Sequence, residues 1–106
     1  MKILISPGFG SGWSTWEHPN MAFDRVLIEA FERGATLGEM EQLCVERGYT
    51  SPYGDPPYMG GFKQLEVREI PSGTLFKIKE YDGSEFVEVF DEDDWYMAEG
   101  EYYDID

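Results

Sequence analysis

The first half of the chain combines one short apolar run with two segments of helical periodicity. Residues 2–6 are rich in isoleucine and leucine, which predicts a buried strand. In residues 21–33, apolar side chains recur every three or four positions and a glycine follows, the pattern of a helix and its stop. Thr36 and Glu39 have the spacing of a capping box, which predicts a second helix over residues 36–47.

The second half changes from loop to strand. Residues 49–61 contain three prolines, three glycines and three tyrosines without any periodic pattern, so we expect a loop there. Three strands are predicted after it, over residues 62–70, 74–81 and 84–90. Asp82-Gly83 between the last two strands is a strong signal for a tight β-hairpin.

These elements predict one α+β domain over residues 1–106. We expect an antiparallel sheet of three strands in a meander, or of four if the N-terminal strand joins it, with the helices packed as a pair on one face. A chain of 106 residues has room for one domain with a modest core. Residues 91–106, an acidic tail, would be partly extended.

Composition narrows the classes of function. The chain has 22 acidic residues against 8 basic ones, a formal charge of −14, which disfavours direct binding to nucleic acid or to an anionic membrane. It has no apolar run of membrane-spanning length, and because its N-terminal apolar run is short and broken by Pro7, we expect no signal peptide. One cysteine, Cys44, allows no internal disulfide and is expected in the core. We therefore expect a cytoplasmic protein whose charged partner is basic.

The negative charge is concentrated at the C-terminal end. Residues 1–79 carry 10 acidic and 8 basic residues, whereas residues 80–106 carry 12 acidic residues and no basic one. One interpretation is a solvated edge that keeps the protein soluble. The other is a ridge of carboxylates that imitates the phosphate charge of a nucleic acid and binds a basic channel, with interleaved aromatic side chains as anchors. The expected partner-binding residues are Glu85, Glu88, Asp91, Glu92, Asp93, Asp94, Trp95, Glu99 and Glu101.

A glycine-rich loop after the first strand is the alternative binding site. Its spacing resembles a phosphate-binding loop, but no offset glycine or lysine completes a nucleotide motif, so a turn that folds two tryptophans over the sheet is favoured. The candidate ligand-binding residues are Gly8, Gly10, Gly12, Trp13, Trp16 and His18. A hydrolase built on Ser14 and His18 has little support, because the spacing matches no known nucleophile motif.

The acidic run at residues 91–94 lacks the glycine and the alternating acids of a calcium-binding loop. Cys44 has no cation beside it in sequence except Arg47, so a nucleophilic role is not expected. We predict no catalytic residues, no metal site and no cofactor.

Two blocks of sequence resemble a group of small acidic phage and prophage proteins. One is the N-terminal stretch that ends in Gly10-Ser11-Gly12-Trp13-Ser14-Thr15-Trp16. The other runs from Tyr58-Met59-Gly60-Gly61 through Pro71-Ser72-Gly73-Thr74 to Glu80-Tyr81-Asp82-Gly83. The resemblance implies a phage or mobile-element origin and, by analogy, an anti-restriction or anti-CRISPR inhibitor. It assigns no activity to any single residue.

Two functions follow as hypotheses. The first is a non-enzymatic, phage-encoded counter-defence inhibitor that presents its acidic C-terminal face to a basic nucleic-acid-binding complex of the host. The second is a protein that binds or sequesters a small nucleotide-like ligand in the loop at residues 7–18.

Overall fold

A computed structural model describes residues 1–10 and 12–89 of the chain. The elements follow the order β1 (Lys2–Ile5), α1 (Arg25–Glu32), α2 (Leu37–Glu46), β2 (Glu66–Glu69), β3 (Phe76–Tyr81) and β4 (Ser84–Val89). Short 3₁₀ turns at Pro19–Phe23 and Phe62–Gln64 precede α1 and β2. The α+β class is therefore as predicted.

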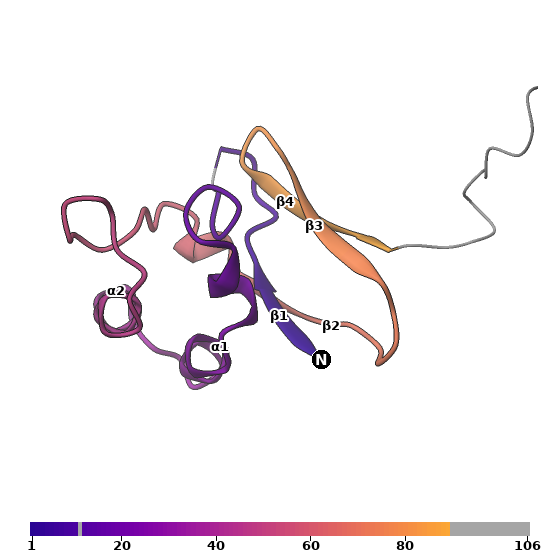
Figure 1. The fold of residues 1–106 in the computed structure, drawn as a ribbon, viewed down its shortest axis with the longest axis horizontal. Coiled ribbons are helices and arrows are strands. Elements are labelled where there is room, and N and C mark those ends of the chain that lie inside the picture. Colours follow the sequence, from indigo (N-terminus) through magenta and orange to yellow (C-terminus); the bar gives the residue numbers. More distant parts are fainter. Residues whose placement is uncertain (11, 90–106) are drawn as a thin grey trace, which may run out of the picture.

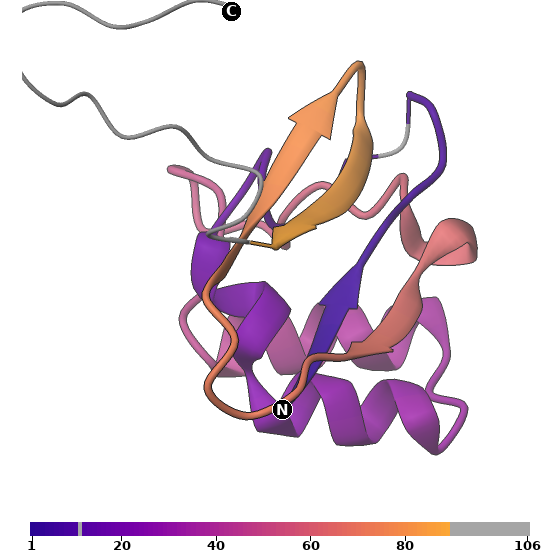
Figure 2. The same ribbon diagram turned by 90° about the vertical axis from the view of Figure 1, so that its right-hand side faces the viewer.

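The strands form two separate antiparallel pairs within the described residues. β1 pairs with β2, with Leu4 opposite Val67, and β3 pairs with β4, with Ile78 opposite Val87. Figure 2 shows β1 and β2 side by side, with the helices behind them. The predicted meander of three or four strands is wrong, because β2 pairs with the N-terminal strand and residues 70–75 carry the chain away to a second sheet.

Three layers result, with β1 in the middle one (Figure 1). Alternate residues of a strand point to opposite faces. Leu4 faces the helices, in a core shared with Leu27 and Met40. Ile3 and Ile5 face the other way and form a second apolar cluster with the β3–β4 hairpin. Burial on both faces explains why residues 3–5 of β1 are all apolar.

The helix ends follow local chemistry. Asp24, not Met21, begins the first helix: its carboxylate accepts hydrogen bonds from the amides of Val26 (2.9 Å) and Leu27 (3.4 Å). The expected helix over residues 21–33 is thus shorter. Thr36 and Glu39 form the predicted capping box at the start of α2.

The β3–β4 turn confirms the hairpin prediction. Asp82 and Gly83 both adopt positive φ, 50° and 84°, as a two-residue turn of this kind requires. On the hairpin, Phe76, Ile78 and Val87 face the β1–β2 sheet, and Lys79, Phe86 and Glu88 lie on the opposite, outward face. This hairpin positions the candidate site described next.

Candidate functional site

The glycine loop after β1 is fastened to the hairpin turn. The amide of Gly10 donates to the carbonyl of Asp82 (2.6 Å), and the amide of Gly12 donates to that of Gly83 (2.8 Å). The hydroxyl of Ser84 donates to the carbonyl of Pro7 (2.7 Å). The amides at positions 10 and 12, which a phosphate would need, are therefore already used within the fold.

Glu85 lies at the centre of this junction and is completely buried, with 0% of its surface exposed. Its Oε1 accepts a hydrogen bond from the Ser6 amide (2.9 Å). Its Oε2 accepts from the amide (2.9 Å) and the hydroxyl (2.6 Å) of Thr15. The Glu85 amide in turn donates to the Ser6 carbonyl (2.8 Å). One carboxylate thus joins β1, the loop and β4.

Because Glu85 is buried, the prediction that Glu85 and Glu88 share an exposed binding face is wrong. The two positions are three residues apart in one strand, so their side chains point to opposite faces. Glu88 lies on the outward face, where its carboxylate pairs with Lys79 at 3.1 Å. Glu85 faces inward and cannot contact a partner in the folded protein.

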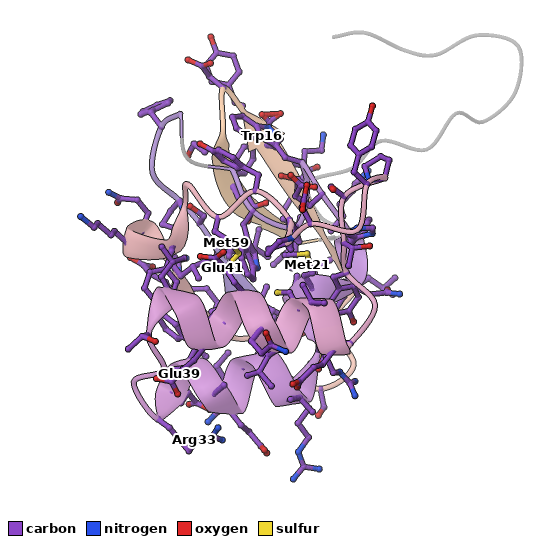
Figure 3. All side chains as sticks on the ribbon, turned by 90° about the vertical axis from the view of Figure 1, so that its left-hand side faces the viewer. Trp16, Met21, Arg33, Glu39, Glu41 and Met59 are labelled. Atoms are coloured by element: carbon purple, nitrogen blue, oxygen red, sulfur yellow. The ribbon has the colours of Figure 1, made fainter. Side chains whose placement is uncertain are left out.

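The two loop tryptophans have different surroundings. Trp13 is fully buried in the helix-side core, so it is not available as a ligand contact. Trp16 is partly exposed at the hairpin end of the molecule (Figure 3), and its indole Nε1 donates to Glu80 Oε2 (3.2 Å). Of the predicted ligand-binding aromatics, only Trp16 is accessible.

His18 and Gly8 also have structural partners. The Nε2 atom of His18 lies 2.9 Å from the carbonyl oxygen of Thr50, which ties the loop to the residues after α2. A Cβ at position 8 would lie 2.6 Å from Gln64 Cγ, so a larger residue there would require the Gln64 side chain to move. Gly10, Gly12, Trp16 and His18 therefore hydrogen-bond within the fold, and Trp13 packs in the core.

Sequence analysis missed a polar cluster centred on Asp24, whose side chain is only 1% exposed. Besides capping α1, its carboxylate accepts from Arg47 Nε (2.9 Å) and Tyr49 Oη (2.7 Å). Burial alone would raise the pKa of Asp24, but the hydrogen bonds from Tyr49, Arg47 and the Val26 amide hold it below its usual value. An apolar helix preceded by aspartate, with an arginine and a tyrosine after the next helix, is too general a signal to predict this cluster.

Burial and the charge of Asp24 also raise the pKa values of two neighbouring side chains, Tyr49 and Cys44. Burial, together with the hydrogen bond to Asp24, raises the pKa of Tyr49 to about 12. Burial and the Asp24 charge raise the pKa of Cys44 to about 11. Cys44 is buried in the core as predicted, and its thiol is protonated at neutral pH, so it is a poor nucleophile there.

A hollow of about 330 Å³ lies beside the start of β1, but its cations Lys2 and Arg25 are already paired with Glu32 and Glu29. No cluster of metal-ligating side chains occurs among residues 1–10 and 12–89. None of the helices in that part is long and apolar enough to cross a membrane.

The other predicted partner-binding residues lie outside the described residues. They are Asp91, Glu92, Asp93, Asp94, Trp95, Glu99 and Glu101. Comparison with protein-family models, curated proteins and solved structures found no match to this chain.

Proposed function

We propose that this chain is a non-enzymatic counter-defence inhibitor of phage origin, which binds a basic nucleic-acid-binding surface of a host complex. The acidic residues after the hairpin make the contact, together with Glu88 on the outward face of the hairpin. The proposal rests on the charge of residues 80–106, which contain 12 acidic residues and no basic one. A cytoplasmic location in the bacterial host goes with this role.

The pairing of cations in the body supports this use of the charge. Five of the eight basic side chains form ion pairs with acids in the described residues: Lys2, Arg25, Arg47, Arg68 and Lys79. Residues 1–89 contain 14 acidic and 8 basic residues, so the body is itself at −6. Residues 1–89 therefore offer little positive charge to neutralise the eight acidic residues of 90–106, and these acidic residues can pair with a basic partner.

The small-ligand alternative receives less support from the described geometry. A nucleotide-like ligand in the loop would need free backbone amides and accessible rings. The amides of Gly10 and Gly12 donate to the hairpin, and Trp13 is buried. Binding in the loop would require the hairpin turn to detach first.

The test is an affinity capture of the tagged full chain from bacterial lysate, at low and high salt, read by mass spectrometry. We expect one dominant complex with a basic nucleic-acid-binding subunit, and less of it at high salt because charge pairs at the rim are screened. The variant with Asp91→Lys, Asp93→Lys and Asp94→Lys should lose this complex.

The matched control changes the net charge equally but elsewhere. Glu41→Lys, Glu46→Lys and Asp55→Lys lie on α2 and in the following loop, away from the hairpin. These three side chains form no ion pair within the described residues. Equal loss of binding in both triple variants would mean that only the overall charge matters, and the proposed C-terminal face would be rejected.

A further inference from the structure

An exposed aromatic pair lies at the hairpin end of the protein. The ring centroids of Trp16 and Tyr58 are 5.6 Å apart and the ring planes are tilted by 39°. Each residue keeps 45% of its surface exposed, although both are large and apolar. Figure 3 shows Trp16 near the hairpin turn and away from the helices.

Two glycines leave space for these rings. Gly12 has a φ of +60°, and a Cβ there would overlap the indole ring of Trp16. A Cβ at Gly60 would overlap the Tyr58 hydroxyl. Each ring therefore packs against a glycine, and a side chain at either glycine would displace the ring.

Carboxylates flank the pair. Glu80 Oε2 accepts from the indole of Trp16 (3.2 Å) and from the amide of Gly83 (2.9 Å), and Glu17 Oε1 accepts from the amide of Tyr58 (2.9 Å). The second oxygen of each carboxylate accepts no hydrogen bond from the described residues. The ion pairs within that part of the chain also leave out Glu17, Glu80 and Asp82.

We propose that the Trp16–Tyr58 pair and its flanking carboxylates are a receptor for one arginine side chain of the partner protein. This rests on the proposed function, since it names a contact of the same basic partner. A guanidinium can stack on an indole face and at the same time donate to a carboxylate beside it. A lysine ammonium cannot stack in this way, so arginine is preferred.

The receptor extends the interaction surface along the hairpin. Trp16 contacts Glu80, four residues from Phe76 at the other end of β3, and a strand rises about 3.3 Å per residue, so the aromatic site lies roughly 13 Å from the base of the hairpin. A basic partner would therefore contact this aromatic site in addition to the acidic residues that follow β4 in the sequence.

The test uses N-acetylated, C-amidated hexa-arginine and hexa-lysine peptides with the full chain. Binding is followed by the indole N–H signal of Trp16 in ¹⁵N-correlated NMR spectra, assigned with Trp16→Phe, and by anisotropy of the labelled peptides. We expect hexa-arginine to shift the Trp16 signal and to bind more tightly than hexa-lysine. Trp16→Leu keeps an apolar side chain over Gly12 but should weaken hexa-arginine binding about five-fold. Tyr53→Ala, at an aromatic residue that is 91% exposed in another loop, should not weaken it.

A second variant avoids any effect on folding. Glu80→Gln retains an oxygen for Trp16 and Gly83 but removes the charge, and should weaken hexa-arginine about three-fold. Glu46→Gln, which changes the charge equally on α2, is the control. An unmoved Trp16 signal, equal binding by both peptides, or equal effects of Glu80→Gln and Glu46→Gln would overturn the receptor.

Failure of the receptor can be told from failure of the proposed function. The variant with lysines at 91, 93 and 94 should bind hexa-arginine more weakly but still show the Trp16 shift at saturation. Loss of the capture complex in that variant, with no Trp16 response in the wild type, would reject the receptor and leave the acidic segment as the binding face.

Discussion

Replacing Glu85 by alanine tests whether this buried carboxylate joins the three parts of the fold. The substitution leaves the Ser6 amide, the Thr15 amide and the Thr15 hydroxyl without their acceptor. A buried donor without a partner costs about 1–3 kcal/mol, and Ser6 is buried whereas Thr15 can reach water. Adding the cost of the cavity that the lost side chain leaves, we expect a destabilisation of about 3–5 kcal/mol.

That loss is a large part of the stability of a small domain, which is about 5–15 kcal/mol in total. Urea unfolding at pH 7, followed by circular dichroism, measures it as a lower midpoint with an unchanged slope. Glu85→Gln keeps the shape but turns an amide N–H toward a backbone N–H, so it should cost less, about 1–3 kcal/mol.

Glu88→Ala is the internal control on the same strand. It removes one partly exposed ion pair with Lys79, which is worth about 1 kcal/mol or less. If Glu85→Ala proved no more destabilising than Glu88→Ala, Glu85 would not be the buried link between β1, the loop and β4, and the described hairpin position would be wrong.

Three further predictions concern the rest of the fold. Asp24→Asn should lower the free energy of unfolding by about 1–3 kcal/mol at pH 7. Because folding lowers the pKa of Asp24, its carboxylate stabilises the fold above the unfolded-state pKa, near 3.8, and this stabilisation is lost as the pH falls below that value. The unfolding curves of wild type and variant should therefore converge in acid. Cys44, with a pKa of about 11, should react with a thiol reagent at pH 8 only on unfolding in urea; rapid reaction in the native state would contradict its burial. Gly61→Ala would bring a Cβ within 2.6 Å of Ser6 Oγ and into the Gly12 carbonyl, so it should lower the melting temperature. Gly38→Ala lies on open helix surface and should stabilise the fold by about 0.5–1 kcal/mol. Similar effects of the two substitutions would argue against close packing of the loops.

Local signals in the sequence predicted local structure. The Thr36–Glu39 capping box, the Asp82-Gly83 turn and the apolar run at residues 2–6 each depend on neighbours in the chain, and each forms as expected. Asp24 was missed as the start of α1, because the apolar residues before it continue the helical spacing while the backbone adopts a 3₁₀ turn.

Strand pairing depended on distant contacts that no local pattern shows. Nothing in residues 62–70 distinguishes a strand that pairs with its neighbour from one that pairs with β1, more than 60 residues away. In the candidate site, the alternation of side chains along β4 was the available signal. Glu85 lies on the same face as Val87, which packs in the inner apolar cluster, and Glu88 lies on the opposite face. The pairing of Trp16 with Tyr58 joins two loops and had no signal in either one.

The proposed function is tested most directly by competition with nucleic acid. Once the basic partner has been captured and purified, its labelled nucleic acid is titrated with the wild-type chain and with the Asp91→Lys, Asp93→Lys, Asp94→Lys variant. We expect the wild type to displace the nucleic acid, less effectively at high salt, and the variant not to displace it. A ternary complex in which the partner holds both the chain and its nucleic acid would contradict it.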